Sequence, residues 1–301
     1  MRKIFCQSLM EFVPREDFVF LTGDLGYMAL EPLRDALGPR FINAGVAEQN
    51  MISVAAGLAK SGLRPWAYSI APFIYARPFE QIRNDVCLHD LPVVLVGNGG
   101  GYGYGVMGAT HHAIEDYGVL LCLPNLRVYV PAFAADLPAV VQALFELPHP
   151  AYLRLGRDER PADLTLPEYA PWRKLQDGDG LTMLVVGPLV GGILQAVRNL
   201  PGRQRPSVWL LSELPWTSLP QEFMNEIAKT DHLLVVEEHV AHGGVGQMMA
   251  HSLAMAGLAP RRFTHRAAQG YVSGRYGSQV FHRCESGIDP VSIAQLCAGE
   301  S

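Results

Sequence analysis

Residues 41–51 read Phe-Ile-Asn-Ala-Gly-Val-Ala-Glu-Gln-Asn-Met, a short apolar run followed at once by an amphipathic pattern that continues to residue 60. This order predicts a strand that leads directly into a helix. Glu48 then lies beyond the carboxyl end of a strand and in the first turn of a helix, where open α/β sheets usually bind ligands. The alternative is that Glu48 only complements the helix dipole, an effect worth about 0.3–1 kcal/mol.

The same alternation extends in both directions from this segment. Runs rich in Val, Ile and aromatic residues predict strands at 17–23, 40–46, 65–70, 92–97, 126–131 and 151–155. Amphipathic stretches predict helices at 28–37, 47–60, 74–89, 112–122 and 134–146. Because parallel strands need crossover helices, this order predicts a mostly parallel sheet with helices on both faces.

The pattern restarts after a segment rich in proline and in charges of both signs. Strands are expected near 181–187, 207–213, 232–238 and 262–267, and helices near 189–199, 220–229, 244–257 and 290–298. We therefore expect an α/β protein of two consecutive domains, each a mostly parallel sheet covered by helices. The predicted boundaries are 1–160 for the first domain, 161–180 for a linker and 181–301 for the second domain.

The composition is typical of a strongly buried, oligomeric α/β protein. Charged residues make up 18% and hydrophobic residues 49% of the 301 residues, against a charged share of roughly 25% in typical domains. The 24 basic and 29 acidic residues give a net charge of −5 without any basic run. Nucleic-acid binding is therefore not expected, and a small-molecule substrate is the better default.

No segment has the pattern of a membrane span or of an export signal. The longest uncharged hydrophobic stretch, 181–197, is interrupted by glycine and proline and suits a strand, a turn and a helix. The N-terminal residues turn polar before an apolar core of signal length develops. The five cysteines are odd in number and widely spaced, which is typical of reduced thiols, so we expect a cytoplasmic protein.

A second informative segment follows the apolar run 93–96. Residues 97–112 read Gly-Asn-Gly-Gly-Gly-Tyr-Gly-Tyr-Gly-Val-Met-Gly-Ala-Thr-His-His. The glycines allow a ligand to approach closely, and the two histidines supply proton-transfer or hydrogen-bonding groups near neutral pH. The glycine spacing matches neither a Walker loop nor a dinucleotide fingerprint. A glycine-rich surface loop with two solvated histidines is therefore the alternative.

Three further polar patterns do not predict a metal site. Gly-Asp-Gly at 178–180 resembles the start of a diphosphate-and-magnesium motif, but residues 200–224 contain no Asn to complete the oxygen shell, so we interpret it as a turn. The histidines at 232, 239, 242 and 251 lack the spacing that fills a tetrahedral zinc shell. Glu-Glu-His at 237–239 is interpreted as structural, with a functional polar group as the alternative.

Taken together, these segments resemble the C-terminal half of a transketolase, a pyrimidine-binding domain followed by the transketolase C-terminal domain, over essentially the whole chain. Seven elements carry the resemblance in the family's order, and their combination is specific where any one of them is weak. They are Gly-Val-Ala-Glu-Gln-Asn at 45–50, Phe73 with Arg-Pro-Phe-Glu-Gln-Ile-Arg at 77–83, Gly-Ala-Thr-His at 108–111, Leu-Pro-Asn-Leu at 123–126, Tyr-Leu-Arg-Leu-Gly-Arg at 152–157, Gly-Pro at 187–188, and Glu-Glu-His at 237–239 with Gly-Gly at 243–244.

The resemblance implies thiamine diphosphate as the cofactor that carries the chemistry. It implies Glu48 as the catalytic glutamate that hydrogen bonds to the aminopyrimidine ring, and Phe73 as the aromatic residue that stacks on that ring. His111 matches a catalytic histidine that faces the reacting carbon of the donor as a hydrogen-bond donor or proton shuttle. His112, beside it, is expected to contact the substrate.

Substrate recognition is expected to involve arginines and one departure from the family. Arg2, Arg157 and Arg77 match or lie near anion-binding arginines of the family, with surface or salt-bridging roles as the alternative. Val106 and Met107 replace a Glu-Asp pair whose aspartate contacts a substrate hydroxyl, so Met107 would meet the substrate there. A hydroxyl at that point would lose its partner at about 1–3 kcal/mol, which favours a deoxy, nucleotide-linked or 2-oxo-acid donor.

The resemblance covers only half of a full transketolase, so it implies a partner. The expected partner is an N-terminal, diphosphate-binding transketolase-like subunit in an α2β2 assembly with sites at subunit interfaces. Thiamine diphosphate would be shared with that subunit, and Mg²⁺ or Ca²⁺ would be bound through it, with no metal site in this chain.

The leading functional prediction is the β subunit of a two-component, thiamine-diphosphate-dependent, transketolase-like enzyme. It would transfer a ketol or acyl unit with cleavage and formation of a C–C bond, and would be active only with its partner. The first alternative is a β subunit of a 2-oxo-acid decarboxylating enzyme or acyloin synthase. The second, less expected, is a non-catalytic scaffold subunit.

Overall fold

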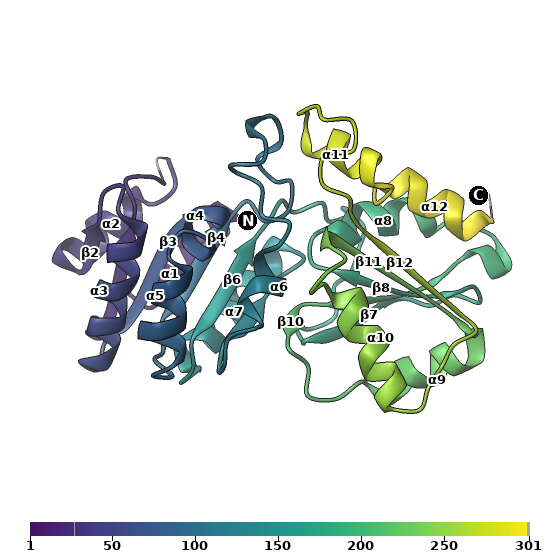
Figure 1. Cartoon of the computed structure of the whole chain (residues 1–301), viewed down its shortest axis with the longest axis horizontal. Helices are drawn as coiled ribbons and strands as arrows, with labels where there is room; N and C mark the ends of the chain where they lie inside the picture. Colours follow the sequence, from purple (N-terminus) through teal and green to yellow (C-terminus); the bar gives the residue numbers. More distant parts are fainter. Residues whose placement is uncertain (27, 300–301) are drawn as a thin grey trace.

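The computed structural model describes residues 1–26 and 28–299, and it arranges them as two α/β domains side by side (Figure 1). A seven-stranded sheet forms the centre of the first domain and a five-stranded sheet that of the second. Both sheets are mostly parallel and covered by helices, which confirms the predicted fold class.

The sheet of the first domain has the strand order β10-β5-β6-β4-β3-β1-β2, and all neighbours are parallel except β10 and β5. Along β1, Phe18 and Phe20 face one core whereas Val19 and Leu21 face the other. All four are buried because helices cover both faces and successive side chains of a strand alternate. The strands are β1 (Phe18–Thr22), β2 (Phe41–Asn43), β3 (Arg64–Ile70), β4 (Val94–Asn98), β5 (Arg127–Tyr129), β6 (Ala151–Leu155) and β10 (Glu213–Leu214).

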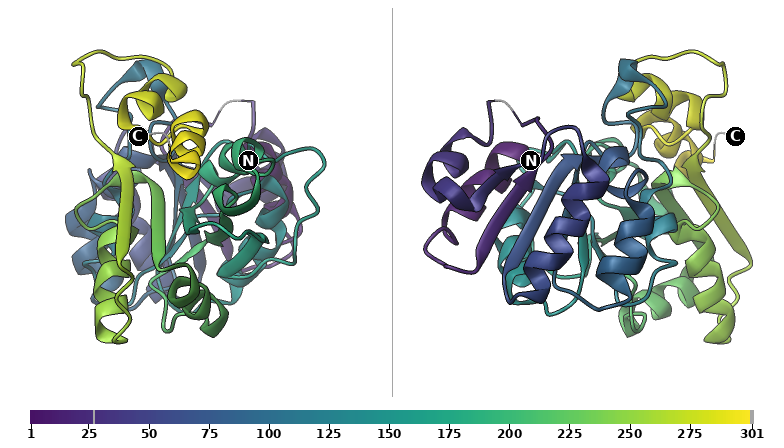
Figure 2. Two further views of the ribbon diagram at one scale, coloured as in Figure 1. Left: turned by 90° about the vertical axis from the view of Figure 1, so that its right-hand side faces the viewer. Right: turned by 60° about the vertical axis from the view of Figure 1, so that its left-hand side comes forward.

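The helices of the first domain divide between the two faces of its sheet, as the two views of Figure 2 show. The face that contains Phe18 packs against α1 (Arg2–Met10), α2 (Glu31–Leu37) and α7 (Leu137–Glu146). The opposite face packs against α3 (Glu48–Lys60), α4 (Ala71–Tyr75), α5 (Phe79–Gln81), the π-helical turn η2 (Ile82–Cys87) and α6 (Asp116–Leu120). Three 3₁₀ turns complete the domain, η1 (Gly38–Arg40), η3 (Gly105–Met107) and η4 (Ala134–Asp136).

The sheet of the second domain has the order β12-β11-β8-β9-β7, in which only β7 is antiparallel to its neighbour. Its strands are β7 (Trp172–Gln176), β8 (Thr182–Val186), β9 (Ser207–Leu211), β11 (His232–Val240) and β12 (Arg262–Ala268). One face packs against α8 (Leu189–Val197) and α12 (Pro290–Ala298), the other against α9 (Gln221–Thr230) and α10 (Val245–Met255). The remaining helical segments are η5 (Gly202–Gln204) and α11 (Gln279–Ser286).

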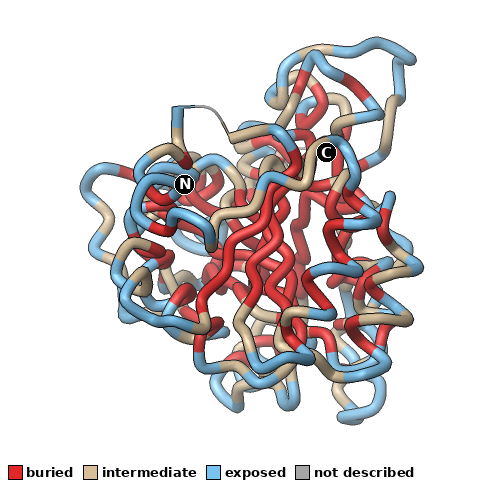
Figure 3. Tube along the Cα trace, turned by 90° about the vertical axis from the view of Figure 1, so that its left-hand side faces the viewer, coloured by how far each residue is buried: buried red, intermediate tan, exposed pale blue. Residues whose placement is uncertain are grey.

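One hydrophobic core runs from the first domain into the second. Val128 and Val130 belong to the same buried cluster as Leu184 and Leu211 of the second domain. Strand β10, which follows β9 in the chain, returns to the first sheet and pairs Leu214 with Val128. Figure 3 shows the buried strands inside an exposed outer layer of helices and loops. The two domains are therefore packed as a unit.

Several elements differ from the sequence prediction. Helix α1, helix α11 and strand β10 were not expected, and β7 lies within the range 161–180 that was predicted as a linker. The helix expected at 74–89 is divided: α4 ends before Pro78, which cannot continue a helix interior, and α5 then passes directly into the π-helical turn η2. None of the helices in the described ranges combines the length and the apolar character that crossing a bilayer requires.

Candidate active site

The predicted site residues gather at the carboxyl edge of the first sheet. Glu48 follows β2, Phe73 and Arg77 follow β3, His111 follows β4, and Arg157 follows β6. Because these strands are parallel, their carboxyl ends meet at one edge. The fold therefore brings together residues that are far apart in the sequence.

Glu48 is the first residue of α3, and its side chain is buried. The turn before it needs Gly45, whose φ of 67° favours glycine. The Nη1 atom of Arg77 donates a hydrogen bond of 2.7 Å to Oε1 of Glu48. The carboxylate thus has a partner outside its own helix, which goes beyond complementing a helix dipole.

The guanidinium of Arg77 also lies on the ring of Phe73. Its Cζ atom is 3.7 Å from the ring centroid, the geometry of a cation–π contact. The ring of His111 makes an edge contact with the ring of Phe73, with 5.2 Å between centroids and 62° between planes. Glu48, Arg77, Phe73 and His111 therefore form a continuous row, which we call the Glu48–His111 row.

Two polar residues extend this row and were missed by the sequence analysis. Tyr104 lies 5.9 Å from His111 between ring centroids, and Nδ2 of Asn98 donates to the Tyr104 hydroxyl oxygen at 2.7 Å. Burial raises the pKa of Tyr104, while the hydrogen bond from Asn98 acts to lower it. The position of Asn98 at the end of β4 was the signal that could have indicated it.

Arg2 reaches the same edge from the other face of the sheet, because α1 is anchored there by the buried side chains of Phe5 and Leu9. Burial raises the pKa of Tyr68 and of Tyr104, and the nearby charge of Arg2 acts against both shifts. Arg157 is exposed two residues beyond β6, and no described residue forms a hydrogen bond or ion pair with it.

His112 and Met107, both expected to contact the substrate, lie in different surroundings. His112 is buried, its Nε2 donates to the carbonyl of Gly105 at 2.8 Å, and its Nδ1 lies 2.9 Å from the hydroxyl of Tyr271. Both ring nitrogens of His112 therefore have partners within the chain. Met107 lies on η3 with its side chain half exposed, beside the exposed Val106.

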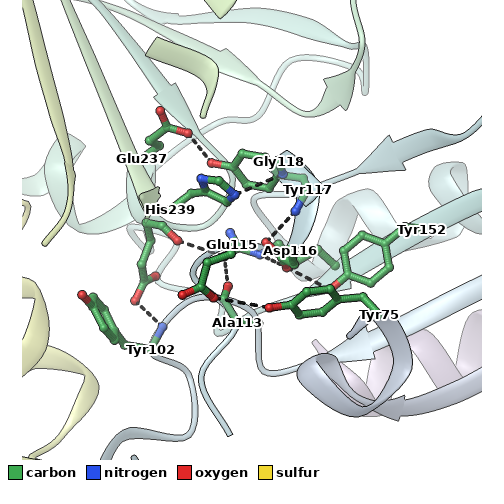
Figure 4. A network of polar contacts seen from close by, with 12 residues as sticks. Tyr75, Tyr102, Ala113, Glu115, Asp116, Tyr117, Gly118, Tyr152, Glu237 and His239 are labelled. Carbon is green, nitrogen blue, oxygen red and sulfur yellow. Dashed lines mark hydrogen bonds and ion pairs between the residues drawn. The ribbon is translucent and has the colours of Figure 1, made fainter. Parts of the chain in front are cut away.

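A buried polar network lies behind the site where the two domains meet (Figure 4). Asp116 accepts hydrogen bonds from Nε of Arg154 at 2.8 Å and from the hydroxyl of Tyr152 at 2.9 Å. Nη2 of Arg154 also donates to the carbonyls of Ala113 and Glu238, each at 2.9 Å. Arg154 therefore ties the end of the glycine-rich loop to β11 of the second domain.

The Glu-Glu-His segment of β11 belongs to this network. Glu237 accepts from the backbone amides of Val245 and Gly246 at the start of α10, at 2.8 and 2.9 Å, and from the hydroxyl of Tyr117. His239 stacks on Tyr117 with 3.9 Å between centroids and accepts from the amide of Gly118 at 3.1 Å. These contacts join the domains, which favours the structural interpretation.

Gly178-Asp179-Gly180 also has a structural explanation. The segment leads into β8, and a Cβ atom at Gly178 would lie 2.3 Å from the carbonyl oxygen of Arg205. Glycine is needed there because two backbone segments approach closely. Within residues 1–26 and 28–299, no group of three or more His, Cys, Asp or Glu side chains is arranged to hold a metal ion.

Comparison with known proteins matches residues 2–161 to the family described as transketolase, pyrimidine binding domain. The chain is 31% identical over 261 residues to an apulose-4-phosphate transketolase subunit of Phocaeicola vulgatus, covering 84% of this chain and 83% of that protein. It is 32% identical to the putative transketolase C-terminal section of Methanocaldococcus jannaschii, covering 98% of this chain and 94% of that protein.

A longer relative and a solved structure are also similar to this chain. The chain is 30% identical to 1-deoxy-D-xylulose-5-phosphate synthase of Myxococcus xanthus, covering 87% of this chain but 44% of that protein. A structure described as split gene transketolase, inactive beta4 tetramer, superposes with a TM-score of 0.80 at 27% identity over 99% of this chain and 97% of that chain.

Proposed function

Because the chain belongs to the transketolase family, with a transketolase pyrimidine-binding domain at residues 2–161, we propose that it is the β subunit of a two-component, thiamine-diphosphate-dependent, transketolase-like enzyme. It would transfer a ketol or acyl unit with cleavage and formation of a C–C bond. The observation that carries this proposal is the Glu48–His111 row at the carboxyl edge of the first sheet.

The row fits the aminopyrimidine ring of the cofactor. Arg77 already places a flat group with N–H donors against Glu48 at 2.7 Å and over Phe73 at 3.7 Å. An aminopyrimidine is also flat and also offers N–H donors, so the same two side chains suit it. The Arg77 side chain is 46% exposed, which leaves it room to move outward when the ring enters.

When bound, thiamine diphosphate supplies the electron sink that allows a bond beside a carbonyl group to break. Glu48 would hold a proton shared with the ring, because a buried carboxylate with one uncommitted oxygen can accept it. Phe73 would fix the angle of the ring through stacking. His111 would donate a hydrogen bond or move a proton at the donor, since its ring lies directly against Phe73.

Donor recognition would use the rim of the site. Arg2 and the exposed Arg157 are proposed to contact an anionic group of the substrate. Met107 and Val106 present apolar surface on the loop that carries His111. This favours a donor without a hydroxyl at that point, and it supports a 2-oxo-acid decarboxylating enzyme or acyloin synthase as the second candidate function.

The partner would be an N-terminal, diphosphate-binding subunit, in an α2β2 assembly that holds thiamine diphosphate with Mg²⁺ or Ca²⁺. The names of two relatives, one a transketolase subunit and the other a transketolase C-terminal section, support a divided enzyme. Val46 and Met28 on neighbouring loops at the carboxyl edge are 80% and 93% exposed, which suits a surface that a partner covers. The five free thiols support a cytoplasmic location.

A donor screen on the complex with its partner tests this proposal. Ketol transfer to an aldehyde acceptor without CO₂ release from pyruvate supports transketolase chemistry, whereas CO₂ release from pyruvate supports the second candidate. The Glu48→Gln variant should lose activity, and Glu80→Gln, at an exposed glutamate on α5 in the motif 77–83, is the matched control. Full activity of Glu48→Gln would refute the catalytic assignment and leave the scaffold alternative.

A further inference from the structure

The glycine-rich loop, residues 99–113, is held by the second domain rather than free in solvent. In Figure 1 the loop rises beside the segment that leads into α11. The Tyr102 hydroxyl donates to the carbonyl of Gly270 at 2.9 Å, and its amide donates to Oε1 of Glu238 at 3.1 Å. The ring of Tyr102 stacks on His282 with 4.9 Å between centroids. Glu238 is in turn fixed by Arg283 at 2.9 Å.

Three glycines of the loop are explained by this contact. A Cβ atom at Gly101 would lie 2.6 Å from the Glu238 side chain, one at Gly108 would lie 2.9 Å from the Tyr276 ring, and one at Gly105 would lie 3.2 Å from the backbone of residues 277–279. All three glycines also have positive φ, at 63°, 75° and 48°. The glycine spacing that matches no phosphate-binding loop therefore reflects the close approach of the second domain.

His112, the neighbour of His111, takes part in this contact. Because the Gly105 carbonyl can only accept, Nε2 of His112 carries the proton. In the neutral ring Nδ1 is then an acceptor, so the Tyr271 hydroxyl donates to it at 2.9 Å. The two rings are also stacked, with 5.7 Å between centroids and 16° between planes. His112 thus points into the domain contact, while His111 faces Phe73.

We propose that residues 269–286 of the second domain position His111 for reaction, with the hydrogen bond from Tyr271 to His112 as the decisive contact. The effect on turnover rests on the proposed function, whereas the effect on the loop does not. Tyr271 is a positioning residue, because its hydroxyl hydrogen bonds to His112 and not to any member of the Glu48–His111 row. Its loss should slow turnover and leave cofactor affinity unchanged, since Glu48 and Phe73 lie on other elements.

The first test compares Tyr271→Phe with Tyr276→Phe as a matched control. Both changes delete one hydroxyl, but no described residue hydrogen bonds to that of Tyr276. Backbone amide exchange over residues 99–113 should become about tenfold faster in Tyr271→Phe, the scale expected when a buried acceptor loses its donor. Exchange in Tyr276→Phe should match the wild type. Equal exchange in both variants and the wild type would overturn the proposal.

The second test uses the complex with its partner, hydroxypyruvate as the probe donor, and calorimetric titration with thiamine diphosphate. We expect kcat of Tyr271→Phe to fall about tenfold with the cofactor Kd within about twofold of the wild type. An unchanged kcat, or weaker cofactor binding with no fall in kcat, overturns the proposal. A wild-type complex that binds no cofactor refutes the proposed function instead, and the exchange comparison still decides this inference. If Tyr271→Phe does not fold, Tyr102→Phe is used instead, because it breaks the neighbouring hydrogen bond to Gly270. It must likewise speed amide exchange over residues 99–113 and lower kcat without changing the cofactor Kd.

Discussion

Replacing Arg77 with alanine should strengthen thiamine diphosphate binding by the complex. The Arg77 guanidinium contacts the carboxylate of Glu48 and the ring of Phe73, the two side chains proposed to receive the aminopyrimidine. The wild-type protein must break both contacts before the ring can enter. The alanine variant starts without them, so its unliganded state is less stable while its liganded state is little changed.

The size of the effect follows from the two contacts. An ion pair with one exposed partner is worth about 0.2–1 kcal/mol, and the Arg77 side chain is 46% exposed. A cation–π contact at such a site adds about 0.5–1 kcal/mol. The sum of about 0.7–2 kcal/mol corresponds to a Kd lower by about three- to thirtyfold. Leaving Glu48 buried without its partner acts in the same direction, because it further destabilises the unliganded state.

Calorimetric titration of the complex with thiamine diphosphate and Mg²⁺ measures this change. Arg83→Ala is the matched control, because Arg83 belongs to the same motif, is exposed, and contacts neither Glu48 nor Phe73. Its Kd should equal that of the wild type. Weaker binding by Arg77→Ala with an unchanged control would contradict this prediction, since it would mean that Arg77 helps to hold the cofactor.

Three other changes test the account at separate points. Arg154→Met leaves the fully buried Asp116 without its cation, so urea unfolding should show that the free energy of unfolding falls by about 3–5 kcal/mol. A fall of less than about 1 kcal/mol would mean that this ion pair contributes little to stability. Burial lowers the pKa of His112 and of His282; the unfolded chain therefore takes up more protons as the pH falls below about 6.5, and the free energy of unfolding should fall there. A His112→Gln variant with the same pH dependence as the wild type would exclude His112 as a source. Met107→Asp restores a carboxylate acceptor, so kcat/KM for donors with a hydroxyl at that point should rise about tenfold relative to donors without one, and an unchanged ratio would place Met107 away from the substrate.

The sequence indicated the parts of the fold that depend on local pattern. Successive residues of β1 alternate between two buried faces, and such an apolar run between amphipathic stretches already predicts a strand inside a covered parallel sheet. Glu48 became a candidate because a carboxylate directly after a strand lies where parallel sheets bind ligands, and the family resemblance supplied its proposed role. Both inferences depend only on residues that are close together in the sequence, within about one helical turn or one strand.

The features that were missed depend on contacts between distant segments. Strand β10 is two residues long and gains its identity only by pairing with β5. The pairing of Arg77 with Glu48 joins α3 to the segment after α4, and the orientation of His112 depends on Tyr271 of the other domain. Nothing in the local pattern distinguishes His111 from His112. The contacts of His112 with Gly105 of its own loop and with Tyr271 of the second domain distinguish the two rings.

The thiamine diphosphate site is proposed to be divided, with one half on this chain and the other half on a partner subunit. Calorimetric titration with thiamine diphosphate and Mg²⁺ of the co-purified complex and, in parallel, of this chain alone tests this division. We expect saturable binding by the complex, weaker binding by its Glu48→Gln variant, and no binding by the chain alone. Tight binding by the isolated chain, or none by the complex, would contradict it.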